Sequence, residues 1–267
     1  MKPSDGYIEL IVNPKSGACS SDLRVSKFEA YLREKGFSVQ MHVTKSLEHA
    51  CDLATEAAID FDCCLVVAAG GDGTIREVAH GLEGSDKPLL IVPEGTENLL
   101  ASELGFDENF STLINTFENP QIRALDLGSI NGKCFTSIAG FGFDGDVIKR
   151  VCQKRTGHIT YMDYFWPIWR TFSDYKFDPM KVVVDGSEIF EGRGLVFVGN
   201  ITRYAIGLQI LPKANYNDGL LDICIYKCSS KLKLMKLSVM TVLKRHINTK
   251  DVIYLQGENV SVKQEEK

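Results

Sequence analysis

The stretch Gly70-Gly71-Asp72-Gly73-Thr74 places one carboxylate among three glycines, between an apolar run and a helical pattern. Glycines let a backbone approach a phosphate closely, and the start of a helix offers free N–H groups and a positive dipole end. A carboxylate alone would repel phosphate, but Mg²⁺ is commonly held by one or two carboxylates with phosphate oxygens and water. We therefore interpret the loop as a nucleotide triphosphate site with magnesium near Asp72.

Two familiar phosphate loops do not fit this stretch. No Gly-Lys-Ser/Thr follows, so it is not a Walker A loop, and Arg76 stands where the dinucleotide fingerprint needs its third glycine. Thr74 and Glu77 have the spacing of a capping box, which predicts that the helix starts at about Ile75. The alternative interpretation is a tight strand-to-helix turn with a solvated Asp72.

Polar residues follow the other expected strands in the same way. "NPKSG" (Asn13–Gly17) follows the first strand, Thr44 ends the second, and "PEGTENLL" (Pro93–Leu100) follows the fourth. Asn13, Ser16 and the backbone of this first loop can donate to phosphate. Because open parallel α/β sheets bind ligands at the carboxyl ends of their strands, we expect these loops to share one edge with the glycine loop.

The elements that would position these loops alternate between strand and helix. Apolar runs predict strands at Tyr7–Val12, Phe37–Val43, Cys63–Ala69 and Pro88–Pro93. Helical patterns lie around Leu23, Phe28 and Leu32 up to Gly36, at Ser46–Ile59, from the glycine loop to about Gly84, and at Asn98–Leu104. This alternation with short loops predicts a parallel α/β sheet.

The second half of the chain has a different character. The dipeptides Asn131-Gly132, Asp185-Gly186 and Asp218-Gly219 are hairpin signals between strand-like runs. We therefore divide the chain into an α/β domain at 1–125 and a β-rich domain at 126–267. Helical stretches near Asp144–Thr171 and Lys231–Lys244 interrupt the second domain.

The composition is that of an ordinary globular protein, and it excludes several classes. The 267 residues are 44% hydrophobic and 24% charged, and the net charge of −5 argues against a nucleic-acid binder. No apolar run is long enough to span a bilayer, and "MKPSDGYIELIV" does not look like a signal peptide. The eight cysteines lack zinc spacing, so we expect reduced thiols and a cytoplasmic location.

Several segments together resemble the diacylglycerol kinase catalytic-domain family, which includes bacterial lipid kinases of the diacylglycerol kinase/YegS type and sphingosine kinases. They are "NPKSG", "GGDGTIREVAHGL", "PEGTENLL", "ALDLGSINGKCFTSIAGFGFDGDV" and "GLQILPKANYNDGLLDICIY". The resemblance covers nearly the whole chain. It implies an N-terminal parallel α/β nucleotide-binding domain of NAD-kinase-like type, then a C-terminal antiparallel β-sandwich domain. The implied reaction moves the γ-phosphoryl group of ATP to a hydroxyl of diacylglycerol or a similar lipid.

The resemblance also implies site residues. The ATP contacts would be Asn13, Pro14, Lys15, Ser16, Gly17, Thr44, Gly71, Asp72, Gly73, Thr74, Ile75, Arg76, Glu77 and Thr96. Asp72 and Asp126 match catalytic acids near the phosphates and Mg²⁺. Asn215, Asp218 and the backbone of Leu220 match a second, structural magnesium site, although some members have Asp in place of Asn215. Where bacterial members often have Asn-Asp, this chain has Asn98-Leu99.

The general base is the least secure part of the resemblance. Glu258, in "QGE", superficially resembles the base in the family's Gln-x-Asp-Gly-Glu-like motif. However, "VIYLQGENVSV" looks like the strand pair that precedes that motif, which implies that the last strand of the family domain is missing from 126–267. General-base help supplies about 10²–10⁴-fold, so positioning and magnesium could still support weak transfer.

Two stretches could meet a membrane, where a lipid substrate would lie. Ile159–Phe177 is rich in aromatic residues, and Lys227–Lys250 has many lysines and no acid. The alternatives are a core helix and a solvated helix face. We expect peripheral membrane contact at most, and the oligomeric state stays open, with a dimer as one option.

Two other functions remain open at this point. An NAD kinase shares the glycine loop, although "NPKSG" and "PEGTENLL" argue against it. A nucleotide-binding regulatory protein that has lost its base would bind ATP without turnover, whereas a lipid kinase would turn it over with lipid.

Overall fold

The computed structural model describes residues 6–16, 20–153 and 161–264. The chain forms two compact units, Met1–Cys134 and Phe135–Lys267, and each is described by itself. The boundary predicted after residue 125 falls earlier, just before the short strand β5 (Gly128–Ile130).

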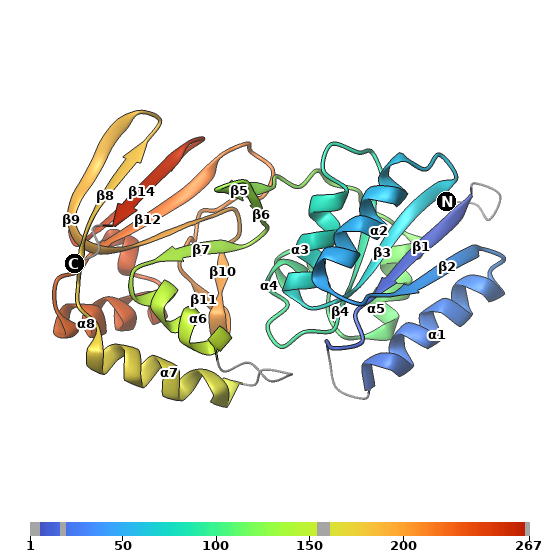
Figure 1. The fold of residues 1–267 in the computed structure, drawn as a ribbon, viewed down its shortest axis with the longest axis horizontal. Coiled ribbons are helices and arrows are strands. Elements are labelled where there is room, and N and C mark those ends of the chain that lie inside the picture. The colour runs from blue at the N-terminus through green and yellow to red at the C-terminus, as the bar shows by residue number, and fades with distance from the viewer. Residues whose placement is uncertain (1–5, 17–19, 154–160, 265–267) are drawn as a thin grey trace. The chain divides into compact units, whose positions relative to one another are not determined.

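Unit 1 is built on a four-stranded sheet in the order β2-β1-β3-β4 (Figure 1). The strands are β1 (Tyr7–Val12), β2 (Ser38–Val43), β3 (Cys63–Gly70) and β4 (Leu89–Pro93). All three neighbouring pairs are parallel. The predicted parallel α/β sheet is thus confirmed, and each strand lies within a residue or two of its predicted position.

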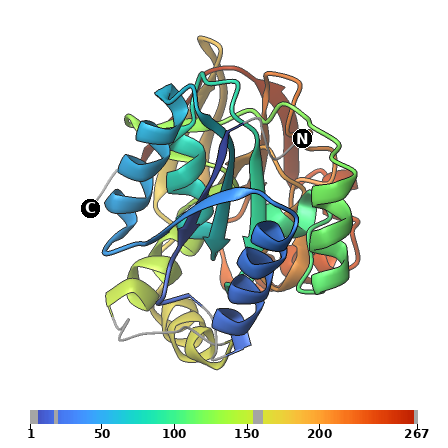
Figure 2. The same ribbon diagram turned by 90° about the vertical axis from the view of Figure 1, so that its right-hand side faces the viewer.

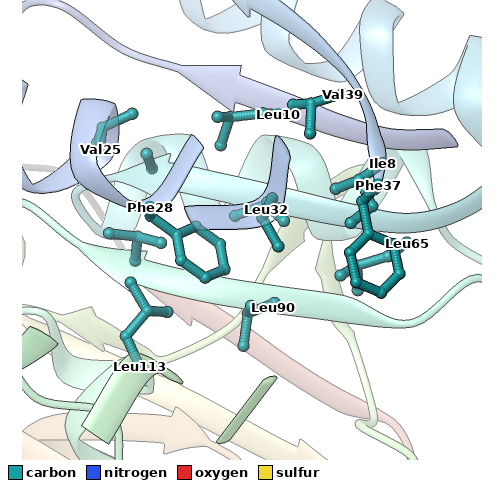
Figure 3. Close-up of a cluster of buried hydrophobic side chains, with 13 residues drawn as sticks. Ile8, Leu10, Val25, Phe28, Leu32, Phe37, Val39, Leu65, Leu90 and Leu113 are labelled. Carbon is teal, nitrogen blue, oxygen red and sulfur yellow. The ribbon is translucent and has the colours of Figure 1, made fainter. Parts of the chain in front are cut away.

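Helices cover both faces of this sheet (Figure 2). They are α1 (Ser20–Glu34), α2 (Leu47–Ile59), α3 (Asp72–Gly81), α4 (Leu99–Glu103) and α5 (Phe110–Glu118). Phe28 and Leu32 of α1 and Leu113 of α5 pack on one face, where Figure 3 shows them in one cluster with Leu10 of β1. Its neighbour Ile11 faces the other cluster, with α2 and α3, because successive strand residues point to opposite faces.

The start of α3 differs from the prediction. The helix begins at Asp72, with Gly71 as its N-cap and no side-chain capping bond, so the capping box at Thr74 is wrong. The Thr74 hydroxyl instead accepts a hydrogen bond from Asn13 Nδ2 at 2.7 Å, and Thr74 is buried in the first helical turn. The helix ends at Gly81, a little before the predicted Gly84.

Unit 2 is an antiparallel sheet in the order β13-β12-β9-β8-β14, with β7 also paired to β9. Its strands are β7 (Ile138–Phe141), β8 (Pro179–Val184), β9 (Ser187–Gly199), β12 (Leu221–Lys227), β13 (Val252–Gly257) and β14 (Val260–Gln264). The long β9 pairs with β8 along its first half and with β7 and β12 along its second. A small pair, β10 (Arg203–Tyr204) and β11 (Leu208–Gln209), lies outside this sheet.

Two of the three predicted hairpins are confirmed. Asn131-Gly132 (φ 50° and 76°) joins β5 to β6 (Lys133–Phe135), and Asp185-Gly186 (φ 48° and 80°) joins β8 to β9. Positive φ at both central residues matches the twist of a tight hairpin. Asp218-Gly219 is not a hairpin turn, because the β12 strand after it pairs with β9 and β13 instead.

The strands around "QGE" are present but do not pair with each other. β13 pairs with β12, whereas β14 pairs with β8 at the other end of the strand order. The turn between them is held by Asp185, whose carboxylate accepts from the Asn259 N–H at 2.8 Å. This turn therefore links the two ends of the sheet.

Three helices complete unit 2: α6 (Phe143–Gln153), α7 (Tyr161–Asp174) and α8 (Lys231–Val242). Within the residues described, no helix combines the length and apolar character needed to cross a bilayer. The cysteines whose side chains are described are free thiols, namely Cys51, Cys63, Cys64, Cys134, Cys224 and Cys228. Cys19 and the side chain of Cys152 lie outside the described part.

Candidate active site

Three polar loops begin at the carboxyl edge of the unit 1 sheet. Beyond the strand ends, the Asn13 N–H donates to Ala69 O (2.9 Å), Thr44 N–H to Val12 O (2.8 Å) and Glu94 N–H to Gly70 O (2.9 Å). Each bond extends the strand ladder by one residue. The first residue of each loop is therefore fixed by the sheet, as the strand-and-loop pattern predicts.

Asn13 joins the first loop to the start of α3. Its Nδ2 donates to Thr74 Oγ1 at 2.7 Å, while its Oδ1 accepts from the Lys15 N–H at 3.0 Å. The Ser16 hydroxyl donates to the Asn13 carbonyl at 2.9 Å. Pro14 and Lys15 are exposed beside these bonds, and Gly17 lies outside the described residues.

Three glycines at this edge are required by the packing of the protein itself. A Cβ on Gly95 would lie 2.7 Å from the Gly71 Cα, and one on Gly71 would lie 3.1 Å from the Gly95 Cα. A Cβ on Gly70 would lie 2.5 Å from the Cβ of Thr74. The loops after β3 and β4 can therefore touch only because these side chains are absent.

Gly73 is different from these three. Among the described residues, a Cβ there would meet only the Leu47 side chain, at an ordinary contact distance of 3.7 Å. Gly73 lies in the first turn of α3, where glycine costs up to about 1 kcal/mol relative to alanine. Internal packing does not explain this glycine, whereas close approach of a ligand to the helix start does.

The carboxylate of Asp72 is engaged by the start of α4. Its Oδ1 accepts from the Leu99 N–H at 2.6 Å. Burial raises the pKa of the Asp72 carboxyl, and the N–H groups of Leu99 and Leu100 oppose that rise. Asp72 is therefore a half-buried link between the third and fourth strand-end loops, and the alternative of a solvated turn residue does not hold.

The carboxylates near the glycine loop could hold Mg²⁺ only together with ligands from a bound phosphate and water. Within the described part of the chain, no group of three or more His, Cys, Asp or Glu could hold a metal ion. A single half-buried carboxylate, Asp72, instead suits Mg²⁺ that is carried largely by phosphate oxygens and water. Asp126 is half-buried in the segment before β5, and its approach to the phosphates remains a prediction.

The remaining predicted ATP contacts occupy varied positions. Arg76 donates from Nε to Glu77 Oε1 at 3.1 Å, so these two side chains pair with each other. Ile75 is fully buried, which leaves only its backbone for a ligand, and Thr44 is also buried. Thr96 is half-buried in the loop after β4.

Sequence reasoning missed the ion pair that anchors the loop after β4. Arg24 on α1 donates from Nε to Glu94 Oε1 at 2.8 Å and from its terminal nitrogens to the carbonyls of Pro93 (2.5 Å) and Glu108 (2.7 Å). Both side chains of this pair are largely buried. A buried acid needs a cation as its partner. The acid inside "PEGTENLL" was therefore the sequence feature that could have predicted an ion pair at this loop.

The predicted second metal site centres on Asp218 in unit 2. Its Oδ1 accepts from the Leu220 N–H at 3.1 Å, and Gln256 Nε2 lies 3.3 Å from its Oδ2. Asn215 is exposed nearby in sequence. Both carboxylate oxygens thus face N–H donors, and the metal site remains a prediction.

Two carboxylates of unit 2 were not singled out from the sequence. Asp222 on β12 is fully buried, accepts from Tyr254 OH at 2.6 Å and Gln256 Nε2 at 3.1 Å, and has its pKa raised by burial. Asp144 on α6 accepts from Tyr204 OH, and burial raises its pKa too. The acid inside the apolar run "LLDICIY" was the sequence feature that could have predicted the burial of Asp222.

Glu258 lies in the exposed turn between β13 and β14. Its backbone N–H donates to Asp185 Oδ1 at 3.2 Å. Its role as a general base remains a prediction.

Unit 1, with its parallel sheet covered by helices, and unit 2, with its antiparallel sheet, together define a two-domain protein of α/β and β type. The description "diacylglycerol kinase catalytic domain" matches residues 8–130, and "YegS C-terminal NAD kinase beta sandwich-like domain" matches residues 137–267. The chain therefore belongs to the diacylglycerol kinase catalytic-domain family, as the sequence motifs suggested.

Individual relatives agree with this membership. The chain is 30% identical over 263 residues to a diacylglycerol kinase of Bacillus subtilis, covering 97% of this chain and 86% of that protein. It is 30% identical over 224 residues to the lipid kinase YegS of Escherichia coli K12, covering 81% and 73%. A crystal structure of a Bacillus anthracis diacylglycerol kinase matches with a TM-score of 0.77 at 25% identity, covering 99% of this chain and 88% of that one.

Proposed function

We propose that this protein is an ATP- and Mg²⁺-dependent lipid kinase that phosphorylates a hydroxyl of diacylglycerol or a similar lipid. The observation that carries the proposal is Gly73, a helical glycine at the sheet edge beside which the described residues leave room for a side chain. Its place at the start of α3, beside the half-buried Asp72, suits the phosphates of a nucleotide with a bound cation. Membership of the lipid kinase family supports the same reaction.

The first-turn N–H groups of α3, with the backbone of Gly71–Thr74, would hold the phosphates. Asn13 would keep the first loop, with Lys15 and Ser16, beside them. When bound with ATP, Mg²⁺ would neutralise phosphate charge, and Asp72 and Asp126 are the residues that would hold it.

The proposed transfer is a single displacement. The lipid hydroxyl oxygen forms a bond to the γ-phosphorus, and the bond from that phosphorus to the bridging oxygen of ADP breaks. The hydroxyl proton passes to a base, for which Glu258 is the candidate. Asn215, Asp218 and the Leu220 backbone are proposed as a structural metal site that takes no part in the transfer.

The test is incubation with γ-labelled ATP, Mg²⁺ and a total lipid extract, followed by separation of the lipids. We expect label in one lipid class, and repetition with pure diacylglycerol, a sphingoid base and a polyprenol would name it. ATP binding without label in any lipid would refute the kinase and favour a regulatory protein. In a parallel incubation with NAD in place of the lipid extract, label in NAD would favour an NAD kinase.

A further inference from the structure

Helix α8 of unit 2 carries apolar residues on two faces. Leu234 and Leu237 are buried against the core of unit 2, together with Thr241. A second stripe is exposed, and its members are Leu232 (80%), Met235 (54%), Val239 (56%) and Val242 (64%). Their spacing of three, four and three residues places them along one side of the helix. We call this stripe the outer face of α8. Exposed apolar residues gathered on one side of a helix are a common feature of interaction sites.

The charge around this face is strongly one-sided. Lys227–Lys250 contains seven Lys or Arg and no Asp or Glu, in a chain of net charge −5. Lys233 and Lys236 both contact Asp251, at 3.0 and 3.3 Å. Lys244 and Arg245 are exposed at the end of the helix. The partner that fits this face is apolar where it meets the stripe and acidic where it meets the surrounding cations.

Helix α7 adjoins the start of α8 and adds exposed indole rings. Lys231 Nζ donates to the Ser173 carbonyl at 2.6 Å, so the last turn of α7 meets the first residue of α8. Trp169 lies one helical turn before Ser173, and Trp166 one turn further back, with 60% and 56% of their surfaces exposed. Tryptophan favours the boundary between lipid headgroups and acyl chains.

We propose that the outer face of α8, with the exposed tryptophans of α7, docks on a bilayer that contains anionic phospholipid. An apolar stripe with lysines on the same helix is the pattern of an interfacial helix, whose apolar side enters the headgroup boundary while its cations meet acidic lipid. A second copy of this chain fits less well, because two such faces would bring like charges together. This inference rests on the proposed function, because a lipid kinase must reach a bilayer to meet its substrate.

The test is flotation of the full chain with vesicles, without ATP. We expect binding to vesicles of equal phosphatidylglycerol and phosphatidylcholine, weakening as salt rises, and far less binding to phosphatidylcholine alone. Lys244→Gln with Arg245→Gln should lower the partition coefficient about 25-fold, at roughly fivefold per charge. Leu232→Ser with Val239→Ser should lower it at least as far.

Matched variants control for charge and for apolar surface. Lys27→Gln with Lys263→Gln removes the same charge, and Phe61→Ser removes a 98% exposed apolar side chain from unit 1. Both controls should bind vesicles like the wild type. Circular dichroism of every variant checks that the fold is kept.

Several outcomes would overturn the proposal. Failure of the wild type to bind anionic vesicles is one, and equally strong binding of the wild type to neutral vesicles is another. The proposal would also be overturned by α8 variants that bind vesicles like the wild type, or by a dimer that Leu232→Ser with Val239→Ser abolishes. Phosphorylation of a short-chain diacylglycerol in detergent micelles separates the two proposals. Docking without any phosphorylation would refute the kinase alone, and phosphorylation without docking would refute the surface alone.

Discussion

Unit 1 holds the half-buried Asp72 and unit 2 the fully buried Asp222, and the two sites differ in what surrounds the acid. Asp72 in unit 1 is bound by main-chain N–H groups at the start of α4, whereas Asp222 in unit 2 is bound by the side chains of Tyr254 and Gln256. Burial raises the pKa of both. Only Asp72 lies beside Gly73, where the part of the chain that the structure describes leaves room for a side chain. Burial is therefore shared by the two acids, and the open backbone of Gly73 is what distinguishes the surroundings of Asp72 from those of Asp222.

Asp72→Asn gives the largest effect that we expect. The amide keeps an oxygen for the Leu99 N–H but loses the charge, so lipid phosphorylation should fall about 10³-fold while the fold is retained. The measurement is labelled-phosphate transfer, with the thermal midpoint alongside. Asp222→Asn is the matched control and should change the transfer rate only a few-fold; equal losses in both variants would break the comparison.

Arg24→Leu should give the largest loss of stability. It removes the cation that pairs with the buried Glu94, and breaking a buried pair in this way costs about 3–5 kcal/mol of unfolding free energy. Urea unfolding measures the loss. The double variant Arg24→Leu with Glu94→Leu should recover part of it, and no recovery would show that packing of the Arg24 stem dominates instead.

The glycines of the sheet edge sharpen the comparison further. Gly95→Ala should cost about 1–3 kcal/mol, because its Cβ would press on the Gly71 backbone. Gly73→Ala should leave stability unchanged or raise it by up to about 1 kcal/mol, yet weaken ATP binding at least tenfold. Urea unfolding and ATP titration separate the two variants. An ATP affinity that Gly73→Ala leaves intact would remove the main support for a ligand at this helix start.

The pH dependence of stability should show the buried acid of unit 2. Folding raises the pKa of Asp222. The contribution of this residue to the free energy of unfolding is therefore fully present below its pKa in the unfolded state, about 4, and is lost as pH rises through its pKa in the folded state. Relative to the wild type, Asp222→Asn should therefore gain stability as pH rises from about 4, by about 1.4 kcal/mol for each pH unit that separates the folded pKa from the unfolded pKa. Urea unfolding between pH 4 and 7 measures this gain, and a constant difference would contradict it.

The sequence predicted those parts of the fold that depend on local patterns. The continuous apolar run Cys63–Ala69 could only be a strand buried on both faces, and its strand end fixed where the glycine loop would lie. Asn131-Gly132 specified its hairpin because positive φ at both residues is cheap for this pair. Such features require no knowledge of distant residues.

The features that were missed depend on long-range contacts. The start of α3 was misplaced because Thr74 accepts a hydrogen bond from Asn13, 61 residues earlier in the chain. The partner of the Asp72 carboxylate lies 27 residues away, at Leu99. Pairing of β13 and β14 with different neighbours is likewise set by the whole sheet, whereas the local pattern shows only two strands.

The most direct test of the nucleotide site is a spectrum of the protein labelled with ¹⁵N at glycine only, titrated with Mg²⁺ and a non-hydrolysable ATP analogue. We predict that the amide signals of Gly71, Gly73 and Gly95 shift, while those of Gly105 and Gly186 remain in place. Unmoved signals from the first three glycines, with shifts elsewhere, would contradict the nucleotide site at the start of α3 and the kinase built on it.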